Sequence, residues 1–151
     1  MNISSQSSLI IPRTFNQQKY VQSLQNPKVP ILISTGPAGC GKTLLACNEG
    51  VSSLKQGDYK KLVITRPAQH VDEEYGFLPG DIDNKMDPWM RPLYDSFNYH
   101  FSSSQIDRFK DSGIIEIAPF AYMRGRTFTN SFIIADEMQN ATVNQMKMLL
   151  T

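Results

Sequence analysis

The stretch VPILISTGPAGCGKTLLACNEG, residues 29–50, decides the fold of this chain. Its first part, 29–35, is a compact apolar run with β-branched residues, a composition that predicts a buried strand. Its last part opens the segment 42–57, in which apolar residues recur at helical spacing up to Gly57, a residue typical of helix C-caps. A glycine-rich turn joins the two parts. Strand, turn and helix in this order are typical of a parallel α/β fold.

The turn itself has the pattern G-x-x-x-x-G-K-T, the Walker A pattern of phosphate-binding loops. Its residues are Gly36, Pro37, Ala38, Gly39, Cys40, Gly41, Lys42 and Thr43. Glycines let the backbone curl so that successive N–H groups face phosphate oxygens. We expect Lys42 to reach the β- and γ-phosphates of a nucleotide and the Thr43 hydroxyl to hold Mg²⁺. The alternative is a chance match in a glycine-rich turn, but the flanking strand and helix stand in the order that the loop requires.

A second apolar run, SFIIA at 131–135, delivers the acidic pair Asp136 and Glu137. A phosphate-binding loop needs such a second strand, whose Asp holds Mg²⁺; we assign that role to Asp136. Glu137 is the candidate catalytic residue that polarises the attacking water, together with Lys42. The alternative is an acidic pair that favours the dipole of the helix after it. The phosphate loop elsewhere in the chain favours the catalytic interpretation.

Two glutamines are further candidates for nucleotide contact. Gln139 gives the sequence DEMQ, which resembles the D-E-x-Q box of superfamily-one helicases, where the glutamine senses the γ-phosphate. It could equally be a solvent-facing amide. Gln17 precedes the phosphate loop and could recognise adenine, as in helicase-like motors. Its alternative is a capping box with Thr14 at the start of a short helix over 14–25.

The rest of the chain alternates apolar strands with helices, which predicts a parallel sheet flanked by helices. The expected elements are strands 61–65, 114–118 and 131–135, an extended loop over 66–86, a helix within 87–101, and helices near 104–111 and 141–150. Arg66 follows a strand and either touches nucleic acid or anchors the loop. Arg124 and Arg126 either meet phosphate or nucleic acid, or form ion pairs with nearby carboxylates.

The composition of the chain limits its size class and the kinds of ligand and location to expect. The 151 residues suffice for one domain with its own core, and a net charge of +1 gives no strong field for binding nucleic acid through charge alone. Cys40 and Cys47 have no spacing typical of zinc sites. The chain has no signal-peptide pattern and no apolar run of about 20 residues. We therefore expect a cytoplasmic protein, in the host cytoplasm if it is viral.

Three segments resemble the PhoH-like proteins: GPAGCGKTLLA, ITRPAQHVDEEYGFLPGDIDNKMDPWMRPLYD and IIEIAPFAYMRGRTFTNSFIIADEMQNATVNQMKMLLT. These are P-loop ATPases akin to the superfamily-one helicase core, associated with phosphate starvation in bacteria and frequent in phages. The resemblance implies a P-loop NTPase fold of the RecA/helicase type, ATP and Mg²⁺ as ligands, RNA-directed activity and ring-shaped homo-oligomers. It runs from about Pro12 to Thr151, so we expect a loose polar arm over 1–12 and one NTPase domain over 13–151.

The resemblance also implies a departure in length. Family members continue to another strand, which in helicase-like sheets lies between the strand of the phosphate loop and the strand of Asp136 and Glu137. Its absence predicts a domain incomplete at the C-terminus, with a slot about one strand wide, ~4.8 Å, between the two half-sites. Either the chain is incomplete, or the two strands pair directly, or something else fills the slot. Three functions stay open: an ATPase, a nucleic-acid motor, or a nucleotide-binding module without turnover.

Overall fold

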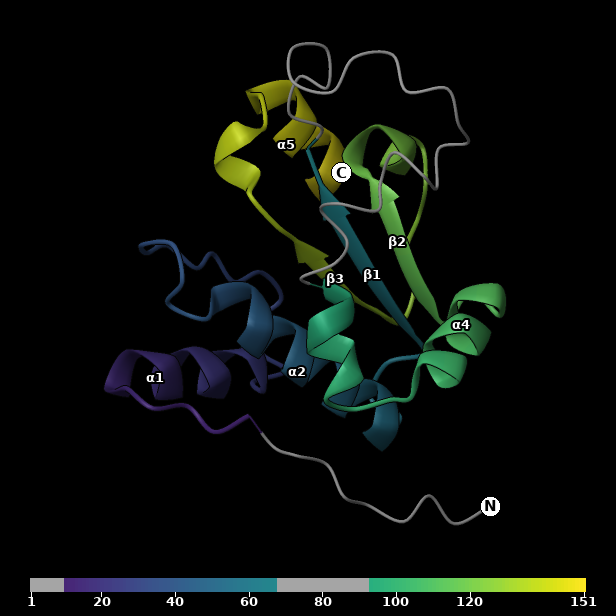
Figure 1. Cartoon of the computed structure of the whole chain (residues 1–151). Coiled ribbons are helices and arrows are strands. Elements are labelled where there is room, and N and C mark those ends of the chain that lie inside the picture. Colours follow the sequence, from purple (N-terminus) through teal and green to yellow (C-terminus); the bar gives the residue numbers. More distant parts are fainter. Residues whose placement is uncertain (1–9, 68–92) are drawn as a thin grey trace, which may run out of the picture.

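The computed structural model describes residues 10–67 and 93–151, which form a three-stranded parallel sheet with helices around it (Figure 1). The elements are α1 (Phe15–Leu24), α2 (Lys42–Gln56), β1 (Lys61–Arg66), α4 (Ser103–Asp111), β2 (Ile115–Pro119), the 3₁₀ turn η1 (Phe120–Met123), β3 (Ser131–Ala135), the 3₁₀ turn η2 (Met138–Asn140) and α5 (Val143–Leu150). A further helix covers residues 93–98. The expected α/β class and these helices and strands are confirmed. From residue 68 on, the expected loop over 66–86 lies outside the described residues. The start of the helix after it and most of the arm over 1–12 also lie outside them.

The sheet order is β2-β1-β3, with every pair parallel. The register sets Leu62 opposite both Ile115 and Phe132. The ladder extends beyond β3, because the backbone N–H of Asp136 donates to the carbonyl oxygen of Thr65 at 2.9 Å. Since parallel strands end at one edge, Arg66 and the acidic pair meet there.

The core lies between α2 and one face of the sheet. Leu62 and Ile64 of β1 are fully buried there, with Phe97 of the helix 93–98. α2 comes close at Gly50, where an added Cβ would meet Leu62 Cδ1 at 2.8 Å and Phe132 Cδ1 at 3.1 Å. This contact fixes α2, and with it the phosphate loop at its N-terminus, against β1 and β3.

The predicted strand over 29–35 is wrong for the described residues. These residues have no strand assignment, and Ile31 and Ile33 are 60% and 78% exposed. The physical reason is the lack of a neighbour: an apolar run becomes a strand only when another strand satisfies its backbone polar groups. The direct pairing with β3 that we considered does not occur, since among the described residues the sheet order is β2-β1-β3 and β3 pairs with β1 alone.

A charged cluster ties the outer strand to the segment after η1. Glu116 of β2 forms ion pairs with Lys61 of β1, at 2.6 Å, and with Arg126. The two terminal guanidinium nitrogens of Arg126 donate to the carboxylate, Nη2 at 2.8 Å. The Arg126 hydrogen bond, helped by Lys61, lowers the pKa of Glu116 to about 2. Arg126 therefore takes the ion-pair alternative.

This cluster predicts a pH-dependent share of stability. Because the pKa of Glu116 is about 2 in the folded chain, its contribution is present above the unfolded value, roughly 4.3, and is lost as the pH falls towards 2. Because the pair is partly exposed, we expect Glu116→Gln to cost only about 1 kcal/mol of unfolding free energy at pH 7, and about half of that at pH 3. Urea unfolding at both pH values measures this. Asp107→Asn, at an exposed position on α4, is the control; an equal cost at both pH values would contradict the assignment.

Candidate functional site

The phosphate loop depends on two glycines with left-handed backbone. Gly39 has φ of 76° and Gly41 has φ of 87°, a region that costs little only for residues without a Cβ. Gly41 is the N-cap of α2, so the helix begins at Lys42. The loop therefore ends at a helix N-terminus, whose unpaired N–H groups and dipole favour an anion.

Lys42 bends back over this loop. Its ammonium Nζ donates to the carbonyl oxygens of Gly36 at 2.9 Å and Pro37 at 2.8 Å, and lies 3.6 Å from the Cys40 sulfur. The charge is thus held across the mouth of the loop by neutral acceptors. An anionic phosphate oxygen forms stronger hydrogen bonds with an ammonium group than a neutral carbonyl does.

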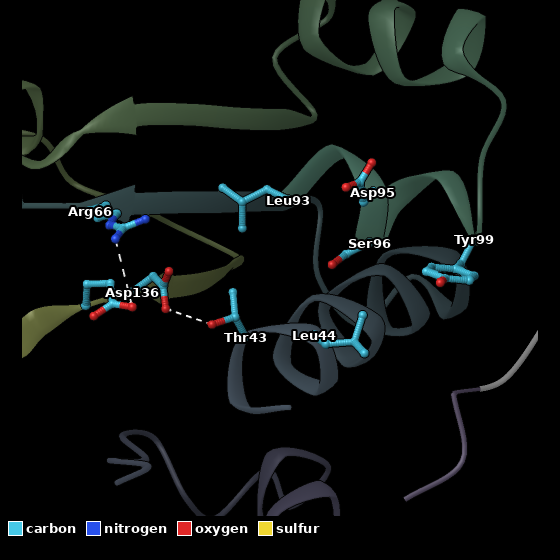
Figure 2. A pocket seen from close by; sticks show the side chains of 9 residues that line it. Thr43, Leu44, Arg66, Leu93, Asp95, Ser96, Tyr99 and Asp136 are labelled. Carbon is cyan, nitrogen blue, oxygen red and sulfur yellow. Dashed lines mark hydrogen bonds and ion pairs between the residues drawn. The ribbon is translucent and has the colours of Figure 1, made fainter. Parts of the chain in front are cut away.

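A hydrogen bond joins the two halves of the site. The Thr43 hydroxyl donates to Asp136 Oδ1 at 2.8 Å, across 93 positions of sequence (Figure 2). Thr43 stands in the first turn of α2, and Asp136 follows the last residue of β3. The hydroxyl and carboxylate predicted to hold one metal ion are therefore in direct contact.

Glu137 is held in an unusual conformation. Its φ of 52° and ψ of 33° lie in the left-handed region, which non-glycine residues adopt rarely and at a cost of order 1–3 kcal/mol. Its carboxylate accepts a hydrogen bond from Gln139 Nε2 and lies 3.9 Å from Arg66 Nη2. Gln139, expected at the γ-phosphate or in solvent, is exposed and contacts Glu137.

Gln17 forms the predicted capping box and also contacts the phosphate loop. Its Oε1 accepts from the Thr14 backbone N–H at 3.1 Å, and the Thr14 hydroxyl accepts from the Gln17 N–H at 3.2 Å, which completes the capping box of α1. Its Nε2 donates to the Cys40 carbonyl oxygen at 3.0 Å. One side chain therefore joins the start of α1 to the phosphate loop.

A pocket of about 430 Å³ opens beside the Thr43–Asp136 pair. Figure 2 shows Arg66 and Asp136 on one side of it and Leu93, Asp95 and Ser96 of the helix 93–98 on the other. Its lining residues are Thr43, Leu44, Arg66, Leu93, Asp95, Ser96, Tyr99, Asp136 and Glu137. Glu137 and the predicted metal-binding residues Thr43 and Asp136 thus share one cavity, whereas Lys42 is not among the residues that line it.

A scan against family models matches residues 9–151 to the PhoH-like protein family. The chain belongs to this family. It is 47% identical to a PhoH-like protein of Bacillus subtilis (strain 168) over 139 residues, 92% of this chain and 43% of that protein. It is 46% identical to a PhoH-like protein of Synechocystis over 143 residues, and 42% identical to Protein PhoH of Escherichia coli (strain K12) over 150 residues.

This PhoH-like chain spans less than half the length of these relatives, 43%, 43% and 42% respectively. The recognition from sequence is confirmed, as is the P-loop NTPase fold class. In the described part of the chain, no helix combines the length and the apolar character needed to cross a membrane.

The PhoH-like site fits the ligands that the family implies. Mg²⁺ prefers oxygen ligands and is usually held by one or two protein groups together with substrate phosphates. The oxygens of Thr43 and Asp136, 2.8 Å apart, are such a pair. Lys42 and the N-terminus of α2 supply positive charge for phosphate on the same side of the sheet.

Two features of the site were missed from the sequence. The contact of Arg66 with Glu137 joins residues far apart in the chain; its only signal was the position of Arg66 at the carboxyl end of a strand. Asp95 and Ser96 of the helix 93–98, and Tyr99 in the turn after it, line the pocket but carried no motif. The contact of Arg66 with Glu137 was assembled by the parallel sheet, which brings the ends of β1 and β3 to one edge.

Proposed function

We propose that this chain binds Mg²⁺ and ATP at the phosphate loop and hydrolyses the nucleotide with Glu137 as general base. The observation that carries the proposal is the hydrogen bond between Thr43 and Asp136, which joins the loop to the acidic strand end at 2.8 Å. Neither the phosphate loop nor the acidic strand end alone would indicate a nucleotide site. Their direct contact supports a single site for a triphosphate and its metal.

Each side chain has a separate task. Lys42 exchanges its loop carbonyl partners for β- and γ-phosphate oxygens, and Thr43 and Asp136 hold Mg²⁺. When bound, the metal neutralises charge on the phosphates. Glu137 accepts a proton from the attacking water, and Arg66 and Gln139 keep its carboxylate turned into the pocket.

Calorimetric titration of the 151-residue chain with ATP, with Mg²⁺ or with EDTA, tests the binding step. We expect binding that tightens at least about tenfold with Mg²⁺, and an Asp136→Asn variant that loses this Mg²⁺ effect while still binding free ATP. Release of phosphate from Mg-ATP then tests turnover. Binding without Mg²⁺ dependence would overturn the metal assignment, and binding without phosphate release would leave a nucleotide-binding module.

The adenine assignment of Gln17 makes its own prediction. Gln17→Glu retains the oxygen that caps α1 but loses the Nε2 donor that faces the loop. We expect the ratio of ATP to GTP affinity to fall about tenfold, the worth of one or two hydrogen bonds, with little change in thermal stability. Added negative charge weakens both nucleotides alike, so the ratio isolates base recognition. An unchanged ratio would leave Gln17 as a structural residue of the loop.

We propose RNA as the nucleic-acid partner and a homo-oligomer as the assembly, both on family resemblance. Phosphate release measured with and without single-stranded RNA at low salt tests the first, because such contacts weaken steeply with salt. Light scattering with and without Mg-ATP tests the second. No stimulation by RNA would count against a motor of the helicase type.

A further inference from the structure

Arg124 and Arg126 stand two residues apart, but the structure gives them different surroundings. Arg126 is bound to Glu116, whereas within residues 10–67 and 93–151 no ion pair involves Arg124, which is exposed. Gly125 between them has φ of 73°, so the backbone turns there through a conformation that glycine adopts at little cost. The two alternatives that the sequence left open for this pair therefore separate: Arg126 takes the ion pair, and Arg124 keeps a charge that no described carboxylate neutralises.

A hollow of about 410 Å³ opens beside Arg124, between the segment after η1 and one face of α5. The residues that line it are Arg124, Asn144, Gln145 and Met148. Met148 lies four residues after Asn144 and three after Gln145, so these three side chains share one face of the helix. In Figure 1, α5 lies beside the turn that follows β2, in agreement with the contacts between α5 and η1. Two segments far apart in the sheet order thus enclose one site.

The polar groups of this hollow are mainly hydrogen-bond donors. Arg124 has only donors. The Oε1 of Gln145 already accepts the Thr142 backbone N–H at 2.7 Å in the capping box of α5, which leaves the Nε2 donor of this amide for another partner. Among the described residues, no carboxylate lines the hollow. A guanidinium and an amide donor without a nearby negative charge are suited to an anion, and a guanidinium matches the geometry of phosphate oxygens.

The apolar neighbours of Arg124 favour a nucleic acid over an acidic peptide. The ring of Tyr122, two residues before Arg124, is 53% exposed, and Met148 adds apolar surface to the hollow. Bases of single strands stack on exposed aromatic rings beside a cationic groove that follows the phosphates. A carboxylate side chain would use the guanidinium but has no aromatic face for the ring. A duplex is less suited, because its bases are already stacked on one another.

We propose that this hollow binds the phosphodiester backbone of a single-stranded nucleic acid. Arg124 and the Gln145 Nε2 hold one phosphate, and Tyr122 stacks on a neighbouring base. The proposal rests on RNA as the proposed partner and adds the site that holds it. The hollow is built from segments that follow the carboxyl ends of β2 and β3, the edge that also carries Asp136 and Glu137. A bound strand is therefore held at the same edge of the sheet as the nucleotide site.

Fluorescence anisotropy of a labelled single-stranded oligouridylate of about 12 nucleotides, titrated with the 151-residue chain without ATP, tests the proposal. Arg124→Gln should weaken binding at least about tenfold and reduce the slope of log affinity against log salt by about 0.7, the share of one phosphate contact. Its matched control is Arg108→Gln, at an exposed position on α4, which precedes β2 and so lies at the opposite end of that strand. The control should stay within about twofold of the parent chain.

Gln145→Glu tests the amide donor without removing the helix cap. A glutamate retains an oxygen for the Thr142 N–H but replaces the donor with a negative charge, so oligouridylate affinity should fall at least about tenfold. Gln105→Glu makes the same change in the capping box of Ser102 on α4 and should leave the affinity within about twofold. Thermal unfolding of both variants should match that of the parent chain, because both caps are kept.

Two outcomes overturn the proposal directly: no binding of oligouridylate by the parent chain at low salt, or binding that both Arg124→Gln and Gln145→Glu retain. A peptide of 12 glutamates that competes as well as unlabelled oligouridylate would make the hollow a protein-binding surface and would overturn it equally. ATP is absent from these titrations, so a failure of the proposed ATP binding or hydrolysis is detected separately and does not decide their result.

Discussion

Lys42→Ala should weaken ATP binding on the order of 100-fold. Its ammonium group is held by the Gly36 and Pro37 carbonyls at 2.9 and 2.8 Å, over the loop in which phosphates are proposed to lie. Hydrogen bonds to charged groups contribute roughly 1.5–3 kcal/mol each, and every 1.4 kcal/mol is about tenfold in affinity. Calorimetric titration with ATP measures the loss.

The control for this prediction is Lys60→Ala, which removes the same charge from an exposed position just before β1. It should leave ATP affinity within about twofold. Thermal unfolding of both variants should resemble that of the parent chain, because Lys42 contributes no buried side chain to the core. Equal ATP affinity in Lys42→Ala and the parent would remove the phosphate loop from the proposed function.

Glu137→Gln should lower ATP turnover at least about 100-fold while ATP affinity changes little. A general base contributes about 10²–10⁴ to rate, and an amide cannot accept the proton from water. The amide still fits the space beside Arg66 and Gln139, so binding geometry is retained. Phosphate release under saturating Mg-ATP, together with a binding titration, separates the two effects.

Arg66→Ala is the informative companion to this variant. Arg66 lies 3.9 Å from the Glu137 carboxylate and lines the same pocket. As a positioning residue it should lower turnover less than Glu137→Gln does, with ATP affinity little changed. If Glu137→Gln leaves a slow hydrolysis unaltered, the chain is a nucleotide-binding module, and Glu137 only faces the pocket.

Local interactions made much of the fold predictable. The capping boxes of Thr14 with Gln17 and of Thr142 with Gln145 have both partners within four residues, and the structure forms both. The loop pattern is also local in sequence, because the left-handed glycines Gly39 and Gly41 lie within four residues of Lys42. The contact between Thr43 and Asp136 followed from two local patterns that a parallel sheet brings to one edge.

The parts of the structure that depend on residues far apart in the sequence could not be predicted in this way. Residues 29–35 have the composition of a strand, but strand pairing depends on a neighbouring strand, which their composition does not specify. The left-handed backbone of Glu137 and its contact with Arg66 are set by how β1 and β3 lie together. Sequence patterns identify the reacting groups of this site; the sheet determines what holds them.

The two contacts of Gln17 couple the order of the start of α1 to the conformation of the phosphate loop, which would otherwise be independent of each other. Its side chain caps the start of α1 and donates to the Cys40 carbonyl oxygen, so fraying of this helix end withdraws a support from the turn proposed to hold phosphate. Binding of a ligand in the phosphate loop should therefore also reduce the mobility of the first turn of α1. A reporter dye attached near Phe15, which is 67% exposed, would register it without touching the catalytic groups.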